Sequence, residues 1–295
     1  MSPRTLATLI GLGAILMWSA LGLMTAASGR VPAFQMNAIA FGISGVVACS
    51  WLALTGRLAV LRQPPKVWAL GIGGLFGFHA LYFTSLRLAP PVEANLVNYL
   101  WPLLIVVLSG LLPGERLRPH HVVGALLGLL GAGVIVTRGQ GLAVDPARAA
   151  GYLAAVGSAV TWAGYSILSR RLGAVPTATV AGFCLATALL SIPCHLAFEE
   201  TVWPQGPVQW AAVVGLGLFP VGLAFFVWDH GVKHGDIQVL GAASYLSPLL
   251  STLLLILAGW GSFTPAVGFA AAAITAGAVI ASRDLLFGRG RSARP

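Results

Sequence analysis

The chain has 295 residues, of which 57% are hydrophobic and 8% are charged, and its formal net charge is +9. A soluble domain carries about a quarter charged residues, so this composition excludes a soluble globular protein and predicts an integral membrane protein. The Lys and Arg residues flank apolar runs and form no aromatic-interleaved basic patch, so nucleic acid is not an expected partner.

Ten apolar runs are long enough to cross about 30 Å of hydrocarbon, which takes roughly 20 residues of α-helix. The first half of the chain supplies 6–27, 33–55, 67–86, 92–112 and 121–137. The second half supplies 151–171, 177–198, 209–231, 237–258 and 265–283. We therefore expect an all-α integral membrane protein with ten transmembrane helices.

The two halves share a phrase, which indicates an internal duplication. Tyr99-Leu-Trp-Pro102 recurs as Tyr245-Leu-Ser-Pro248, 146 residues later. Weak internal symmetry of this kind is how many transporters are built, so transport is the favoured class of function.

The expected domains follow from this duplication. Trp18 lies 144 residues before Trp162, so the offset is nearly constant along each half. Because each half holds five helices, an odd number, the second copy must enter the membrane from the opposite side. We expect a first five-helix repeat over 1–140, an inverted second repeat over 145–286 and a basic cytoplasmic tail over 287–295.

The distribution of Lys and Arg predicts that both termini are cytoplasmic. In that orientation Arg30, Arg87, Arg138 and Arg148 face the outside, and the other thirteen of the 17 Lys and Arg residues are inside. Cytoplasmic loops carry an excess of these residues.

The sequence gives no support for ATP hydrolysis, metal binding or enzyme catalysis. There is no Gly-x-x-x-x-Gly-Lys-Ser/Thr motif and no stretch long enough for a soluble nucleotide-binding domain. His120 and His121 lie at a helix end without Cys or carboxylate at ligand spacing, so no metal or other cofactor is expected. A membrane enzyme needs a polar catalytic cluster, and Glu199, Asp229 and Lys233 are scattered, so we do not expect an enzyme.

Glycines spaced by four occur in two of the expected helices. Gly73 and Gly77 form one such pair, and Gly124 and Gly128 form another. Small residues at this spacing allow membrane helices to approach closely.

Some aromatic and hydroxyl side chains fall near the predicted bilayer centre. Trp18, Trp101 and Trp162 lie near the midpoints of their runs, and Ser244 and Tyr245 lie slightly further out. An aromatic belt would lie at the helix ends instead. Such side chains are expected to face other helices or a wet cavity.

Helical spacing places further groups on shared faces. These faces hold His79, Tyr82 and Phe83; Asn95, Asn98 and Tyr99; Ser158, Trp162 and Tyr165; and Gly241, Ser244 and Tyr245. We expect them to line one central cavity. The alternative is that each residue forms a separate interhelical hydrogen bond.

No Asp or Glu lies at the centre of an expected helix, which weakens exchange of cations for protons. Rings, amides and hydroxyls suit a neutral or zwitterionic solute. His79 is the one titratable group at this depth, and it serves either as a structural hydrogen-bond partner or as a proton relay. Pro102 and Pro248 each remove a backbone hydrogen bond and are either rocking hinges or static kinks.

The repeats, the central Trp of each first helix and the paired phrases Asn98-Tyr-Leu-Trp-Pro102 and Ser244-Tyr-Leu-Ser-Pro248 resemble the drug/metabolite transporter superfamily. The segment from Ala89 to Pro102 is similar to the YddG-type aromatic amino acid exporters. This resemblance implies export of aromatic and other neutral amino acids across a bacterial inner membrane by alternating access.

The resemblance also implies the substrate-binding residues: Trp18, His79, Tyr82, Asn98, Tyr99, Trp101, Trp162, Tyr165, Ser244 and Tyr245, with Phe83 and Phe225 as weaker candidates. We expect facilitated transport, because no coupling carboxylate is evident. The alternative is an exporter of drugs, aromatic cations or another small metabolite, with or without coupling to protons. The expected partners are the amino acid and membrane lipid, with a monomer favoured and a dimer as the alternative.

Overall fold

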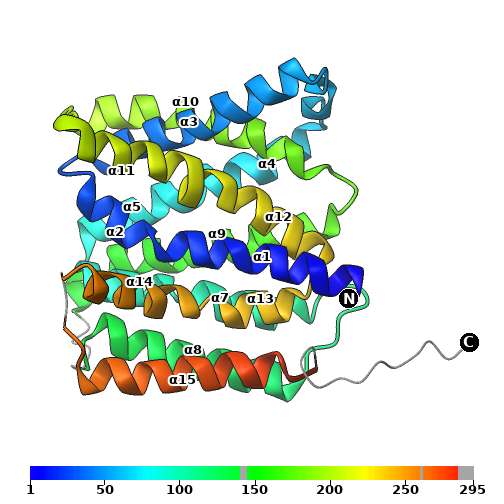
Figure 1. Ribbon diagram of the computed structural model, residues 1–295, viewed down its shortest axis with the longest axis vertical. Helices are drawn as coiled ribbons and strands as arrows, with labels where there is room; N and C mark the ends of the chain where they lie inside the picture. Colours follow the sequence, from blue (N-terminus) through cyan, green and yellow to red (C-terminus); the bar gives the residue numbers. More distant parts are fainter. Residues whose placement is uncertain (140–144, 260–261, 285–295) are drawn as a thin grey trace, which may run out of the picture.

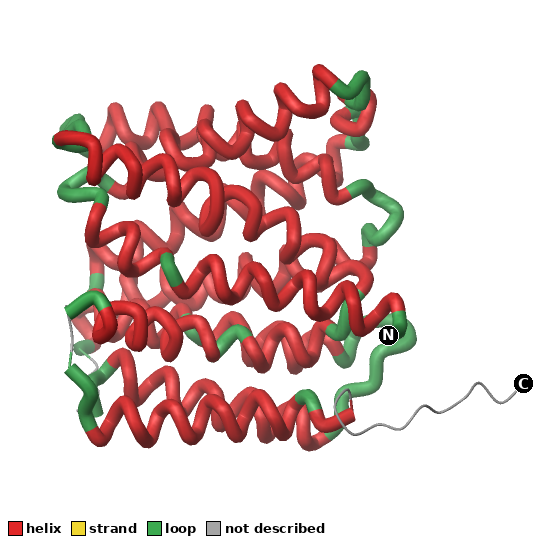
Figure 2. The backbone as a smooth tube through the Cα atoms, in the orientation of Figure 1, coloured by secondary structure: helices red, strands yellow, loops and turns green. Residues whose placement is uncertain are grey.

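The computed structural model describes residues 1–139, 145–259 and 262–284, and every regular element in these ranges is helical (Figures 1 and 2). The expected tail over 287–295 lies outside the described residues. All ten expected segments fall on helices.

In the first half, the helices are α1 Pro3–Ser19, α2 Leu21–Ala27, α3 Ala33–Leu54, η1 Leu58–Leu61, α4 Pro65–Ile72, η2 Gly73–Gly77, α5 Phe78–Leu88, α6 Pro91–Asn98, α7 Leu100–Ser109 and α8 Pro119–Val136. In the second half, they are η3 Pro146–Arg148, α9 Ala149–Arg171, η4 Thr177–Thr179, α10 Val180–Phe198, α11 Gly206–Leu218, η5 Phe219–Leu223, α12 Ala224–His234, α13 Ile237–Ala243, α14 Leu246–Leu257 and α15 Pro265–Ala281.

Eight helical stretches in the described ranges are long and apolar enough to cross a membrane. The other two expected segments, 151–171 and 265–283, are not among these eight, each for a different reason. Helix α15 is apolar but has 17 residues. Helix α9 has 23 residues, but Ser, Thr, Trp and Tyr side chains interrupt its apolar surface. Because α9 packs against α5, α6, α7 and α12, these side chains meet other helices.

Five of the stretches are interrupted inside the bundle. Helix α1 passes into α2 at Ala20, α6 passes into α7 at Tyr99, and α13 passes into α14 at Ser244 and Tyr245. Two short π-helical segments, η2 and η5, connect α4 to α5 and α11 to α12. The first π segment starts 146 residues before the second, which is the offset of the repeated phrase. Single π turns are frequent at functional sites.

The helices pack in pairs that join the two halves of the chain. In Figure 1, α3 lies beside α10 at one edge of the molecule, and α8 lies beside α15 at the opposite edge. Between them, α1 packs on α12, α5 packs on α9, and α7 packs on both α9 and α13. Residues from both halves therefore meet at the centre.

Small residues permit the closest of these contacts. A Cβ at Gly124 would lie 2.5 Å from the carbonyl oxygen of Gly277, so α8 and α15 touch backbone to backbone. A Cβ at Gly128 would collide with the ring of Tyr245. The expectation for Gly73 is wrong, because a Cβ there would meet nothing within 4 Å. Gly73 lies in the π segment, and the tight position is Gly74, which faces Tyr165.

Replacing Gly124 by Ala tests this packing. The added methyl group must push α8 and α15 apart, which costs about 1 to 3 kcal/mol, so the apparent melting temperature in detergent falls. Gly133→Ala, on the same helix, is the matched control, because its Cβ would lie 3.5 Å from a Leu96 methyl group. Equal melting temperatures for the two variants would contradict the backbone contact.

Candidate functional site

Four tryptophan rings and one phenylalanine ring pack together at the centre of the bundle. Trp18 of α1 lies 6.2 Å from Trp101 of α7, 5.8 Å from Trp162 of α9 and 5.1 Å from Trp228 of α12, between ring centroids. Phe225 of α12 lies 6.1 Å from Trp18 and 5.6 Å from Trp162. Most of these contacts are edge-to-face or tilted, as is favourable for aromatic pairs. We call these five residues the ring cluster.

A second group of rings extends the ring cluster along α5. Phe78 lies 5.4 Å from Trp162, and it stacks on Tyr82 at 5.9 Å. His79 packs edge-on against Phe41 of α3 at 5.1 Å and lies 6.2 Å from Phe225. The predicted residue His79 therefore contacts the ring cluster through Phe225, and Tyr82 is joined to it through Phe78.

Burial separates the candidates into two kinds. Trp101 and Trp162 are 7% and 3% exposed, and Tyr165, 5.3 Å from Trp162, is 2% exposed. Trp18 and Tyr82 are half-buried, as are His79, Tyr99 and Phe83. The candidates therefore differ in exposure, with one half-buried group and one group of buried rings packed against it.

The two π segments each present a backbone carbonyl that a candidate side chain binds. Trp18 Nε1 donates to the carbonyl oxygen of Pro220 in η5, at 3.0 Å. His79 Nδ1 lies 2.7 Å from the carbonyl oxygen of Leu75 in η2. A carbonyl oxygen only accepts, so Nδ1 of His79 donates and Nε2 is left as the acceptor of the neutral ring. Both side chains are thereby fixed in orientation.

Amide and hydroxyl groups form interhelical hydrogen bonds beside the rings. Tyr82 Oη donates to Asn95 Oδ1 at 3.1 Å, and Ser158 Oγ of α9 donates to Asn98 Oδ1 at 2.7 Å. Asn98 is 5% exposed. Two Asn side chains of α6 are therefore held by neighbouring helices through their oxygens.

Ser244 and Tyr245 lie apart from the ring cluster, where α7 crosses α13. Both are fully buried, and Ser244 Oγ donates to Leu240 within its own helix at 2.7 Å. Tyr245 Oη accepts from Leu103 N at 3.2 Å and donates to the carbonyl oxygen of Tyr99 at 3.0 Å. These are the two groups that an unbroken helix would join directly, so the Tyr245 hydroxyl is inserted into the backbone ladder at the α6–α7 break.

The break lies three residues before Pro102, and the proline explains it. Pro102 has no N–H, so the carbonyl group of Asn98 lacks its usual partner and the helix loosens there. Pro248 follows the α13–α14 break in the same way. In the described ranges no backbone hydrogen bond joins Leu249 N to Tyr245 O, and no side chain fills this second break.

Charged groups join the two halves at one end of the bundle. Glu115, in the α7–α8 loop, pairs with Arg4 at 3.0 Å and with Arg170. Arg4 also pairs with Asp236 at 3.1 Å. Arg170 donates to the carbonyl oxygen of Gly235 at 2.9 Å. This ion network therefore ties α1 and the α7–α8 loop to the ends of α9 and α12.

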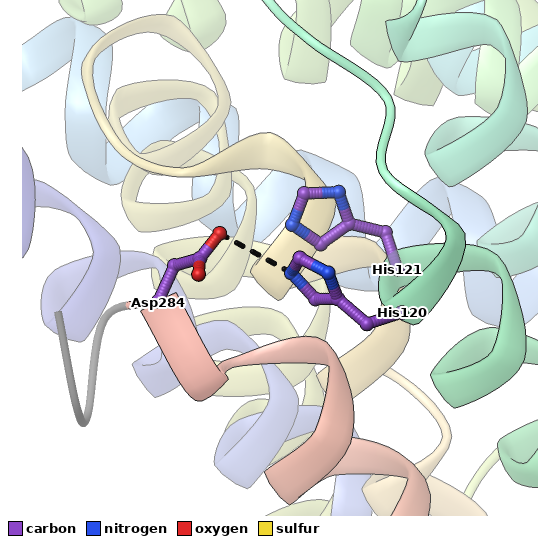
Figure 3. A group of neighbouring side chains, drawn as sticks. All are labelled: His120, His121 and Asp284. Atoms are coloured by element: carbon purple, nitrogen blue, oxygen red, sulfur yellow. Dashed lines mark ion pairs between the residues drawn. The ribbon is translucent and has the colours of Figure 1, made fainter.

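His120, His121 and Asp284 form a separate group where α8 meets the end of α15 (Figure 3). Their potential ligand atoms lie within 4.8 Å of one another, which the sequence spacing did not suggest. However, Arg118 donates to Asp284 Oδ2 at 2.6 Å, and His120 Nε2 lies 3.3 Å from the same oxygen. Because a guanidinium group already occupies this oxygen, the arrangement favours an ion-pair contact over a metal site.

Sequence reasoning missed three residues of the site: Phe41, Phe78 and Trp228. Trp228 is fully buried, and its Nε1 donates to Ser166 Oγ at 3.1 Å. The repeat offset could have found it, because Trp228 lies 146 residues after Tyr82. Phe78 precedes Tyr82 by four residues, so it shares a helix face with it.

Tyr245→Phe tests the inserted hydroxyl. The variant keeps the ring against Gly128 but leaves Leu103 N–H and the Tyr99 carbonyl group unpaired, which costs about 1 to 3 kcal/mol. We expect a lower apparent melting temperature. Tyr165→Phe is the matched control, because the Tyr165 hydroxyl is buried without a hydrogen-bond partner among the described residues. If both variants melt alike, the hydroxyl does not hold the break.

Comparison with known proteins agrees with this architecture. The model of the EamA-like transporter family matches twice, at residues 5–137 and 149–283. The aromatic amino acid exporter YddG of Ancylobacter novellus is 54% identical over 281 residues, 95% of this chain and 98% of that protein.

More distant relatives also align over most of their length. YddG of Escherichia coli is 28% identical, with 85% and 88% of the two chains covered, and a biotin transporter of Salmonella typhimurium is 26% identical, with 79% and 77% covered. A protein crystal structure with 53% sequence identity superposes with a TM-score of 0.90 and covers 97% of this chain and 100% of that one. The chain therefore belongs to the EamA-like transporter family.

Proposed function

We propose that this protein is a facilitative, alternating-access exporter of aromatic and other neutral amino acids. The observation that carries the proposal is the ring cluster, to which α1, α7, α9 and α12 contribute from both halves of the chain. The aromatic amino acid export named for the relative at 54% identity supports the same substrate class.

The chemistry of the site suits such a solute. The half-buried rings of Trp18, His79 and Tyr82 offer apolar faces to an aromatic side chain, and the half-buried Tyr99 offers a hydroxyl group to its charged ends. Asn98 is buried and its oxygen accepts from Ser158, so it supports this face from behind.

The buried carboxylate beside the ring cluster is Asp229 of α12, which follows Trp228, and it pairs with Lys233 at 2.7 Å, so it adds no net negative charge. A zwitterion needs no net countercharge, whereas a cation would gain from one.

The remaining predicted residues take supporting roles in the proposed site. Trp101, Trp162 and Tyr165 back the half-buried rings. Ser244 and Tyr245 act at the crossing of α7 and α13, and Tyr245 reaches the substrate only through the α6–α7 break.

The proposed architecture is ten transmembrane helices in two inverted repeats, over 1–140 and 145–286. The packing pairs support it, because they are those of a two-fold arrangement. Equivalent helices of the two repeats pack on each other, α3 on α10 and α8 on α15. The contact of α1 with α12 is repeated by the contact of α9 with α5. The paired π segments and paired breaks at the same offset add to this symmetry.

Both termini are proposed to be cytoplasmic in a bacterial inner membrane. The start of α1 and the end of α15 lie at the same end of the bundle, since Arg4 pairs with Glu115 and Asp284 pairs with Arg118 of the same loop. The ion network then closes the cytoplasmic side. Pro102 and Pro248 are the proposed hinges for opening it, and the working unit is proposed to be a monomer in lipid.

Efflux from liposomes tests the proposal. Purified protein is reconstituted, and liposomes are preloaded with radiolabelled phenylalanine or tryptophan, with protein-free liposomes as the control. Saturable efflux without an imposed pH gradient is the expected result. If amino acids do not move and aromatic cations or biotin do, the proposed substrate class is wrong and the alternative class is favoured.

Trp101→Ala should weaken this saturable flux. Trp101 packs edge-on against the half-buried Trp18, so its loss should let the Trp18 ring shift and raise the KM by about ten-fold, which corresponds to roughly 1.4 kcal/mol. Trp203→Ala is the matched control, because Trp203 is 56% exposed and lies outside the site. Gel filtration checks that both variants fold, and an unchanged KM would remove Trp101 from the substrate site.

His79→Gln separates facilitated from proton-coupled transport. The amide group can still donate to the Leu75 carbonyl group but cannot carry a proton. For a facilitative carrier, neither the native protein nor the variant accumulates substrate when a pH gradient is imposed. Gradient-driven accumulation by the native protein that is lost in the variant would establish coupling through His79.

A further inference from the structure

An apolar groove of about 550 Å³ lies on the outside of the bundle, away from the ring cluster. Its walls are the second half of α3, the start of α10, and the helices on both sides of η5. The residues that define it best are Ala48, Trp51, Arg57, Ala181, Leu223 and Phe226. We call this feature the α3 groove.

Close packing at the middle of α3 explains why the groove opens beyond it. A Cβ at Gly45 would lie 2.7 Å from Leu185 N of α10, and a Cβ at Gly217 would lie 2.9 Å from the carbonyl oxygen of Ala40. From there α3 continues to Leu54 with Val47 and Trp51 exposed on its outer side. The groove therefore faces the membrane rather than another described helix.

Arg57 is the charged residue of the groove lining, and it lies at the end of the groove where α3 stops. Its side chain is exposed and takes part in none of the ion pairs between described residues. An exposed cation at the rim of an apolar groove matches one class of membrane molecule, in which an anionic headgroup is attached to acyl chains.

We propose that the α3 groove binds an anionic phospholipid, with its phosphate group at Arg57 and an acyl chain against Ala48, Leu223 and Phe226. The proposed orientation of the protein decides only which leaflet supplies the lipid. Because the α3–α4 loop faces the cytoplasm in that orientation, the lipid comes from the cytoplasmic leaflet.

The site connects to the transport machinery through η5. Leu223 ends η5, and the Pro220 carbonyl group of the same segment accepts the hydrogen bond from Trp18. An acyl chain in the groove thus supports the π segment from the membrane side, while Trp18 holds it from within. The bound lipid stabilises the helix break that orients a substrate-site ring.

Native mass spectrometry of the full-length protein tests the headgroup contact. The protein is titrated with palmitoyl-oleoyl phosphatidylglycerol, and with the corresponding phosphatidylcholine as the uncharged comparison. We expect preferential retention of the phosphatidylglycerol, and Arg57→Gln should weaken it about five-fold, as for the loss of one cation beside an anionic surface. Arg62→Gln, an exposed cation nearby that is not in the groove lining, is the matched control.

A second pair of variants tests the acyl-chain contact. Ala48→Phe fills the groove, whereas Val46→Phe introduces the same ring at a position that is 56% exposed and outside the lining. Phosphatidylglycerol should raise the apparent melting temperature of the native protein and of Val46→Phe, but not of Ala48→Phe.

Three outcomes would overturn the proposal: equal loss of lipid in Arg57→Gln and Arg62→Gln, an equal rise in melting temperature with phosphatidylglycerol in Ala48→Phe and Val46→Phe, or a dimer that forms by excluding the lipid. None of these readouts depends on flux, so the lipid site and the export function fail separately.

Discussion

Inside hydrocarbon, a backbone N–H or carbonyl group that loses its helical partner has no water to replace it. Much of this structure follows from that constraint, because five of its helical stretches are interrupted. The Trp18 indole binds the Pro220 carbonyl group, the His79 ring binds that of Leu75, and the Tyr245 hydroxyl bridges Leu103 and Tyr99. The side chains that repair the breaks are among those expected to bind substrate.

The same constraint joins the site to the moving parts. A change in the η5 segment must move the Pro220 carbonyl group and with it the Trp18 ring, which touches the three other tryptophans of the ring cluster. Conversely, a solute that displaces Trp18 acts on a helix break. The hydrogen bond from Trp18 to the Pro220 carbonyl group thereby couples substrate binding directly to helix bending.

Most of the helical segments could be predicted because membrane thickness fixes their length. The expected run 33–55 became Ala33–Leu54, and 177–198 became Thr177–Phe198. The interruptions were harder, because a proline signals a lost bond but not where the chain turns. The α6–α7 break lies at Tyr99 rather than at Pro102, since it depends on a hydroxyl group that arrives from the other repeat.

Depth and helical facing were enough to find Trp18, Trp101 and Trp162 as a group, because these residues stand out from an aromatic belt. They were not enough for Tyr245, whose depth is similar but whose ring turns toward Gly128 and α8. The periodicity of one helix shows which residues share a face, but not which neighbouring helix that face contacts. The ion network is hidden for a similar reason: its arginines also serve as orientation signals, and their partners lie as many as 232 residues away in the sequence.

The polar surface of α9 has a consequence for how the protein is made. A helix with Ser158, Trp162 and Tyr165 on one side leaves the translocation channel for lipid less readily than its neighbours, because hydroxyl and indole groups are costly in hydrocarbon. Three of its packing partners, α5, α6 and α7, precede it in the chain, and α12 follows it. Biosynthesis from the N-terminus thus delivers most of the surface that α9 requires before α9 itself emerges, and the order of the repeats becomes part of the folding pathway.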